Sequence, residues 1–167
     1  MIIAMFASAA FAQVPEQLKK GTIAFQADVT NIDLRLTNGV SLNLGGLGQY
    51  FIMDKLGLVG GIGLNVDSNE QVGAFGETTT SSTTTFDLAF GARYYFLESK
   101  KGSLFATAGF KLATGAGDTQ FGFLLNGGYS FFLNRHISIE PLVSLDLPFS
   151  KGSNVNFNIG AGISIYL

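Results

Sequence analysis

Apolar residues alternate with small or polar ones along most of this chain, and that alternation constrains the fold more than any other feature. In residues 86–97, FDLAFGARYYFL, every second residue from Phe86 to Phe96 is apolar, and the residues between them include Asp87 and Arg93. A period of two residues is typical of β-strands, whose side chains point alternately to opposite faces. The sequence therefore predicts an all-β protein, and the open question is which face of each strand meets water.

The same period predicts eight strands in a chain of 167 residues, a length that suits one domain. The predicted strands are residues 22–36, 41–52, 56–67, 83–97, 103–113, 120–133, 137–147 and 155–167. In the first of them the alternation slips by one residue, which predicts a β-bulge near Thr30 and Asn31. Glycine is frequent (22 residues) and proline rare (3), as expected for strands joined by tight turns.

The connections between these strands alternate in length. Residues 53–55, 98–102 and 134–136 are short; residues 37–40, 68–82, 114–119 and 148–154 lie at the other end of an up-and-down meander, and three of these four are longer. Short turns at one rim and longer loops at the other are typical of transmembrane β-barrels. We interpret residues 68–82, which run into the Thr/Ser-rich stretch 76–85, as a solvated loop; binding of a surface partner is the alternative.

The composition of the polar face indicates its orientation. The surface of a soluble domain is about 25–35% charged, whereas the polar face here is mostly Gly, Ser, Thr, Asn and Ala, and only 13% of all residues are charged. A Lys or Arg facing lipid at mid-membrane would cost about 2–4 kcal/mol, so Arg93 and Lys111 belong inside. The sequence thus predicts an eight-stranded antiparallel up-and-down transmembrane β-barrel. The alternative is a soluble secreted barrel, lipocalin-like or avidin-like, with its apolar face inward around a hydrophobic ligand.

Aromatic residues gather towards the two ends of the predicted barrel. One group lies near the short turns: Tyr50, Phe51, Tyr94, Tyr95, Phe96, Phe131, Phe132 and Tyr166. The other lies near the long loops: Phe75, Phe86, Phe121, Phe123, Phe149 and Phe157. Transmembrane barrels carry aromatic girdles at both membrane interfaces, so we predict two girdles.

Six charged residues fall on the predicted interior face: Asp28, Asp87, Arg93, Lys111, Glu140 and Asp146. Arg93 and Glu140 lie at one height, a second level holds Asp87, Lys111 and Asp146, and Asp28 lies at mid-height. Unpaired charges in a narrow lumen are costly, so we predict an interior ion-pair network. Such a network is either a structural plug or a gate in a narrow ion path.

Catalytic, cofactor and metal sites are not indicated. The chain has no cysteine and a single histidine, His136, which lies in a short turn and cannot form a metal cluster alone. The glycine runs at 45–48 and 57–63 lack the strand–loop–helix context of a phosphate loop. The net charge of −2 and the lack of a basic stripe give no indication of nucleic-acid binding.

The N-terminus has the apolar core and A-x-A pattern of a secretory signal peptide, ending at Ala10-Phe11-Ala12. It lacks the usual basic residues, and the alternative is a short hydrophobic helix packed on the domain. We expect a signal peptide at 1–12, a periplasmic segment at 13–20 and the barrel domain at 21–167.

This architecture, with the signal peptide and the terminal strand NFNIGAGISIYL, resembles the small eight-stranded outer-membrane barrels of the OmpX and OmpA-transmembrane-domain kind over residues 21–167. Those proteins usually end in an aromatic residue, whereas this chain ends Tyr166-Leu167. The resemblance implies a monomer in the outer membrane of a Gram-negative bacterium, in contact with lipids and lipopolysaccharide and inserted by the barrel-assembly machinery. It also implies a structural or surface-interaction role in membrane integrity, adhesion or defence, without enzymatic activity or a cofactor.

Overall fold

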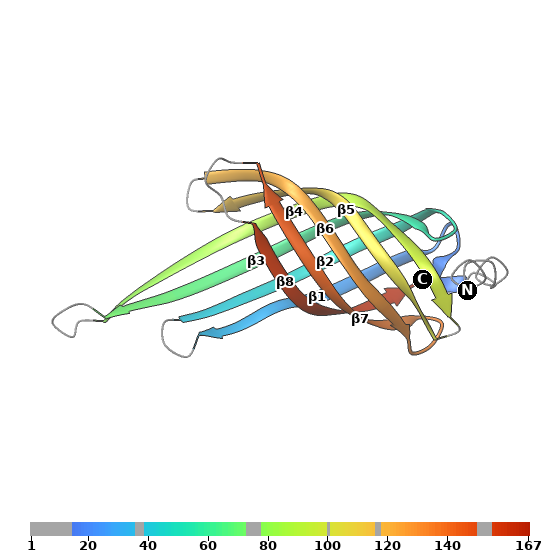
Figure 1. Cartoon of the computed structure of the whole chain (residues 1–167), viewed down its shortest axis with the longest axis horizontal. Coiled ribbons are helices and arrows are strands. Elements are labelled where there is room, and N and C mark those ends of the chain that lie inside the picture. The colour runs from blue at the N-terminus through green and yellow to red at the C-terminus, as the bar shows by residue number, and fades with distance from the viewer. Residues whose placement is uncertain (1–14, 36–38, 73–77, 100, 116–117, 150–154) are drawn as a thin grey trace, which may run out of the picture.

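The computed structural model describes residues 15–35, 39–72, 78–99, 101–115, 118–149 and 155–167 as one closed antiparallel barrel, with its eight strands paired in chain order (Figure 1). The strands are β1 (Ile23–Arg35), β2 (Gly39–Met53), β3 (Leu56–Val72), β4 (Thr78–Ser99), β5 (Gly102–Gly115), β6 (Asp118–Phe132), β7 (Ile137–Pro148) and β8 (Asn156–Tyr166). A short 3-10 helix, η2 (Glu16–Leu18), precedes them. Within the described residues, no helix has the length and hydropathy needed to cross a membrane. The predicted fold class is confirmed; the predicted signal peptide, 1–12, lies outside the described residues.

The two ends of the barrel differ. The turns after β2, β4 and β6 are short and lie at the same end as η2 and the last residues of β8, which we call the short-turn end (Figure 1). At the opposite end, the hairpin end, β3 and β4 run well past the other strands as a projecting ribbon. The up-and-down path thus places the short turns at one end of the barrel and the projecting ribbon at the other.

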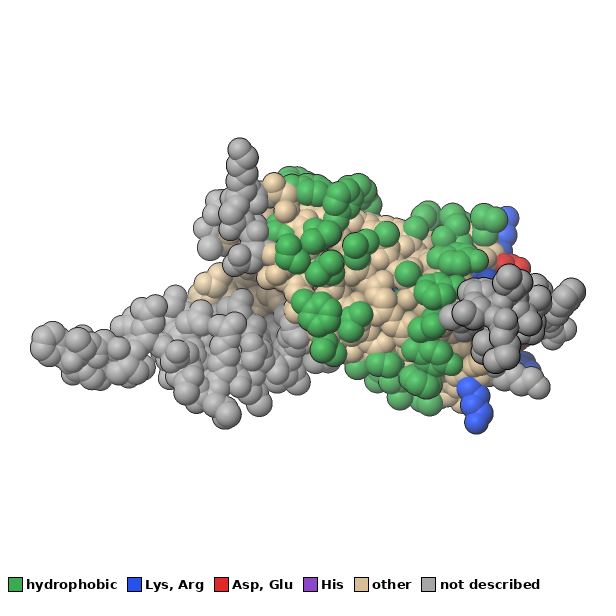
Figure 2. Space-filling model, in the orientation of Figure 1, with side chains coloured by type: hydrophobic (Ala, Val, Ile, Leu, Met, Phe, Trp, Pro, Cys, Tyr) green, Lys and Arg blue, Asp and Glu red, His purple; other side chains and the backbone are tan. Residues whose placement is uncertain are grey.

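The outer wall of the barrel is apolar. Large hydrophobic side chains point outward from every strand, and Ile62, Phe90 and Phe157 are each more than 60% exposed. Figure 2 shows such side chains over the face of the wall that is in view. A soluble protein rarely exposes apolar area on this scale, whereas a barrel in lipid requires it. The predicted orientation, apolar out and polar in, is confirmed, and the alternative with the apolar face inward is wrong.

Strand register confirms the predicted bulge. The β1–β2 pairing shifts by one residue between Thr30 and Ile32, where the apolar alternation also slips. One extra residue in a strand shifts the alternation of its side chains by one. The position of the bulge therefore agrees with the slip in the sequence pattern.

The prediction of a loop over residues 68–82 is wrong for most of that span. β3 continues to Val72 and β4 begins at Thr78, with the ladder between them unbroken. Threonine is β-branched and favours strands. The apolar alternation fades over these residues, so the sequence pattern that marks the other strands is missing although the backbone pairing persists.

The girdle at the short-turn end contains fewer aromatic residues than predicted. Tyr50, Tyr94, Phe96 and Phe131 are exposed on the wall, but Phe51, Tyr95 and Tyr166 are buried inside the barrel. Position parity explains the difference, because Tyr95 shares the inward face of β4 with Arg93. At the hairpin end Phe86, Phe121, Phe123, Phe149 and Phe157 are exposed as predicted, and Phe75 lies outside the described residues.

Gly91 on β4 and Gly109 on β5 face each other where the two backbones approach closely. A Cβ atom added at Gly91 would overlap the backbone of Ala108 and Gly109. We expect Gly91→Ala to cost about 1–3 kcal/mol, the usual penalty of overpacking. The folded fraction after refolding into detergent, measured by heat-modifiable gel migration, checks this.

Gly60 on β3 provides the matched control, since a Cβ there meets no heavy atom within 4 Å. Gly60→Ala should refold like the unmodified chain. Equal folded fractions for the two variants would contradict the close approach of β4 and β5.

Candidate functional site

A buried ion pair crosses the lumen near the short-turn end. Arg93 on β4 and Glu140 on β7 lie 3.1 Å apart, with 1% and 0% of their side chains exposed. Arg93 Nε also donates to Thr107 Oγ1 (2.9 Å), and its Cζ lies 4.3 Å from the centroid of the Phe105 ring. The guanidinium is thus held by a charge, a hydroxyl and an aromatic face, which fixes it across the barrel.

Glu140 is the acceptor around which this level is organised. Its Oε2 accepts from Arg93, and its Oε1 accepts from Ser130 (2.8 Å), Ser138 (2.9 Å) and Tyr166 (2.9 Å). A buried carboxylate is tolerated when both oxygens are hydrogen-bonded and a positive charge lies close. Glu140 and its partners therefore form a hydrogen-bonded polar layer inside the barrel.

An apolar layer joins this polar one at the short-turn end. Residues 15–20, which we call the strap, place Leu18 at 0% exposure inside the mouth of the barrel. Leu18 belongs to one buried cluster with Ala24, Phe51, Tyr95, Phe105, Leu142 and Tyr166. We refer to the polar layer and this cluster together as the floor.

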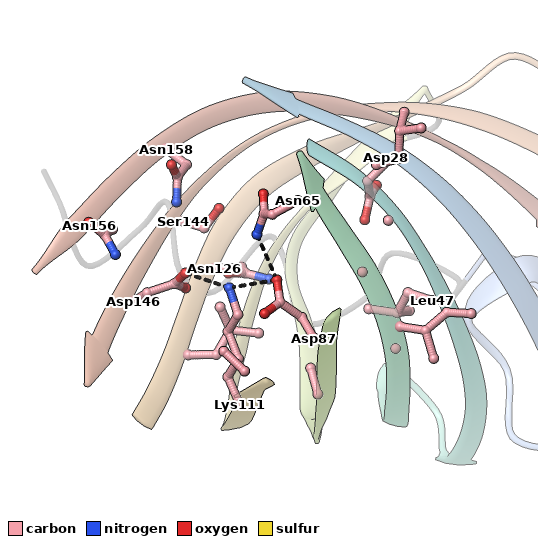
Figure 3. Close-up of a pocket in the computed structure, with 18 of the residues that line it drawn as sticks. Asp28, Leu47, Asn65, Asp87, Lys111, Asn126, Ser144, Asp146, Asn156 and Asn158 are labelled. Atoms are coloured by element: carbon pink, nitrogen blue, oxygen red, sulfur yellow. Dashed lines mark hydrogen bonds and ion pairs between the residues drawn. The ribbon is translucent and has the colours of Figure 1, made fainter. Parts of the chain in front are cut away.

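A second charged cluster lies nearer the hairpin end (Figure 3). Lys111 Nζ on β5 lies 3.2 Å from Asp87 Oδ2 on β4 and 2.9 Å from Asp146 Oδ2 on β7, and Asn65 donates to Asp87. Side-chain exposures of 12–22% show that these groups are less buried than the floor pair. Asp87 and Asp146 each retain one buried oxygen without a partner among the described residues, so this cluster is held less completely than the floor.

Asp28 on β1 makes no ion pair among the described residues, and Gln26 connects it to the floor instead. Gln26 Nε2 donates to Asp28 Oδ1, and Gln26 Oε1 accepts from Arg93 Nη1 at 2.7 Å. The six interior charges thus form three groups. Lys111 pairs with Asp87 and Asp146, Arg93 pairs with Glu140, and Asp28 is connected to Arg93 through the amide of Gln26. Asp87 and Arg93, although on one strand, bond to different partners.

A cavity of about 590 Å³ occupies the lumen above the floor. Its polar lining includes Asp28, Asn65, Asp87, Lys111, Asn126 and Asp146. Arg93 and Glu140 do not line this cavity, and their layer lies between it and the short-turn end.

Sequence reasoning identified the charges but missed their partners. Gln26, Thr107, Ser130, Ser138 and Tyr166 all lie on the inward face, and position parity alone could have found them. What parity cannot supply is which strands face each other across the lumen, because β4 meets β7 only once the barrel closes. The described residues contain no group of three His, Cys, Asp or Glu placed to hold a metal ion, and His136 contacts the Tyr166 carbonyl oxygen at the rim.

Comparisons with known proteins show the fold. No protein-family model and no curated protein sequence matches the chain. The N-terminal β-barrel domain of OprF from Pseudomonas aeruginosa superposes with a TM-score of 0.57 at 13% identity, over 89% of this chain and 98% of that one. OprG, an outer membrane protein of the same organism, superposes with a TM-score of 0.59 at 14% identity, over 89% of this chain and 97% of that one. A transmembrane β-barrel designed de novo superposes with a TM-score of 0.58 at 14% identity, over 89% of this chain and 98% of that one. The chain thus shares the architecture of small outer-membrane barrels.

Removing Glu140 while leaving Arg93 in place should destabilise the barrel strongly. We expect Glu140→Ala to cost about 3–5 kcal/mol, because it leaves a buried, uncompensated guanidinium. The Arg93→Met, Glu140→Met double variant should recover part of that loss. Urea titrations of the barrel in lipid vesicles, followed by heat-modifiable migration, measure both.

Asp146→Asn is the control in the upper cluster, where Lys111 keeps Asp87 as a partner. Asp146→Asn should lower the free energy of unfolding clearly less than Glu140→Ala does. If the two substitutions cost the same, the ion pair in the floor is no more important to stability than the partly exposed cluster.

Proposed function

We propose that this protein is a monomeric, integral protein of the bacterial outer membrane with a structural or surface-interaction role, and that it neither transports solutes nor catalyses a reaction. The apolar wall supports residence in a membrane, and the fold it shares with OprF and OprG supports the outer membrane as that membrane. Its wall would contact lipids and lipopolysaccharide, and the barrel-assembly machinery would insert it. Envelope integrity, adhesion and defence are the roles in question.

The closed floor supports a role other than transport. The Arg93–Glu140 layer and the apolar cluster around Leu18 fill the lumen at the short-turn end. Eight strands leave an interior just wide enough for side chains. We therefore interpret the floor as a structural lock and not as a gate in an ion path.

The observation that carries the surface-interaction role is the free edge of β4. Pairing of β4 with β5 ends at Thr85 and Gly115, whereas β4 continues to Thr78 paired only with β3. One edge of Thr78–Thr84 thus has no neighbouring strand among the described residues. Such an edge can accept an additional strand from another polypeptide through main-chain hydrogen bonds.

The sequence of this edge supports the same proposal. Residues 78–84, TTTSSTT, contain no charge and no proline. Natural proteins usually protect exposed edges with lysine, proline or a bulge, because an unprotected edge pairs with other chains. The projecting edge carries none of these in residues 78–84 and is therefore suited to bind an extended segment of an external protein.

Conductance across a planar bilayer tests the closed floor. We expect the purified barrel to carry no steady current at low voltage. Arg93→Ala should remain non-conducting while losing stability, because Phe51, Tyr95 and Phe105 still fill the mouth. A steady current from the unmodified barrel contradicts the closed floor, and a current from Arg93→Ala alone would identify the ion pair as a gate.

Adhesion of producing cells to immobilised carboxymethylated casein, an extended polypeptide, tests the edge of β4. Cells producing the unmodified barrel should adhere better than cells without it. The Thr80→Lys, Ser82→Lys variant should lose most of this gain, since charges on an edge oppose strand addition.

Gln71→Lys places a charge on β3 of the same hairpin and serves as the control; adhesion should be retained. All variants must be recovered from the outer-membrane fraction with heat-modifiable migration. Equal adhesion by the edge variant and the control would refute strand addition, and recovery in the soluble periplasm would refute the membrane assignment.

A further inference from the structure

The strap crosses the mouth of the barrel and is held from two opposite sides. Gln17 Nε2 donates to the Asn134 carbonyl oxygen in the β6–β7 turn (3.0 Å), and the Lys55 amide in the β2–β3 turn donates to the Leu18 carbonyl oxygen (2.7 Å). These two turns are four strands apart in a closed barrel of eight, so they lie across the mouth from each other. The strap is therefore bound by the finished barrel and not by one hairpin.

The contact is centred on a single side chain. Leu18 is fully buried against the aromatic residues Phe51, Tyr95 and Phe105. Gln17 is buried with it, whereas Glu16, Lys19 and Lys20 are exposed. The strap thus resembles a short peptide with one anchoring residue in a preformed pocket.

Opposing contributions of comparable kind set the strength of this contact. Docking buries one leucine and forms a few hydrogen bonds, one of them from the Lys20 amide to Asp54 Oδ1 (2.9 Å). The loss of conformational freedom of about six residues offsets most of this gain and leaves the docked strap favoured by a small margin. The salt bridge from Arg135 to Glu16, at 3.8 Å and largely exposed, adds little.

The strap can also leave without breaking the strand pairs of the wall. Gly21 joins it to β1 with a φ of +92°, a conformation that glycine adopts without strain. The Gly21 amide donates to the Phe51 carbonyl oxygen (2.8 Å), and the β1 ladder begins at Ile23. A change of backbone angles at Gly21 would swing the strap out of the mouth at the expense of that one bond, while the strand pairs from Ile23 onward stay formed.

We propose that the mouth at the short-turn end is a peptide-binding site for a leucine-bearing segment, filled in this chain by its own residues 15–20. The strap then works as a releasable latch. When it leaves, the aromatic pocket is exposed, while the Arg93–Glu140 layer still closes the lumen above it. If the proposed function holds, this site faces the periplasm; the docking itself does not depend on that assignment.

Hydrogen exchange at the Lys55 amide tests the latch, because that amide donates to the strap. In the full-length barrel in detergent micelles, Leu18→Asp should speed this exchange about tenfold to a hundredfold, the range that corresponds to losing one buried leucine. Lys19→Asp, which changes an exposed neighbour, should leave it unchanged. NMR-detected exchange measures all three proteins.

Peptide rescue then identifies the site. Added at millimolar concentration, because it lacks the tether that favours the intact strap, the peptide PEQLKK should slow Lys55 exchange in the Leu18→Asp barrel. The peptide PEQDKK should not.

Three outcomes overturn the proposal. The first is unchanged exchange in Leu18→Asp, and the second is equal rescue by both peptides. The third is failure of both Leu18→Asp and Leu18→Ala to fold, which would make the strap an obligatory part of the core. None of these results bears on adhesion or conductance, so the latch and the proposed function fail separately.

Discussion

Hydrogen bonding of the backbone is the constraint on which the rest of this structure depends. In lipid no water satisfies a free N–H or C=O group, so a sheet can cross a membrane only if its last strand pairs with its first. Here β8 pairs with β1 from Tyr166 and Ala24 to Gly160 and Thr30, and Ile23 and Leu167 exchange backbone hydrogen bonds at the rim. Closure in turn forces successive side chains alternately into lipid and into a narrow lumen.

The narrow lumen explains why the buried charges at one end are so fully bonded. A charge there has lost most of its hydration and is stabilised instead by hydrogen bonds from neighbouring side chains. Arg93 and Glu140 make six side-chain hydrogen bonds, one of them to each other. A cavity lies towards the hairpin end, and the cluster around Lys111 is looser. Bonding among the interior charges is therefore denser near the short-turn end than beside the cavity.

Much of this architecture could be predicted from the sequence because side chains in a β-strand alternate between two faces with a period of two residues. The strands, the bulge at Thr30–Asn31 and the heights of the interior charges all follow from counting by twos. Where the period carries no information, prediction failed. Beyond Asp67 the apolar alternation fades although the β3–β4 pairing continues, so the pattern could not mark this part of the ribbon as strand. The strap is six residues without any period, and its binding pocket exists only after distant turns meet.

The β3–β4 ladder has a mechanical consequence. Its register runs without a shift from Leu56 and Tyr94 at the short-turn end to Val72 and Thr78 in the projecting ribbon. A pull on the tip of the ribbon along its axis therefore loads two continuous strands that are built into the wall on both sides. The force runs along the strands into the barrel, where many backbone hydrogen bonds resist it together in shear. The bonds are therefore not broken one after another, as they would be if a loop were peeled away. The wall of the barrel thus anchors the projecting ribbon through the full length of β3 and β4.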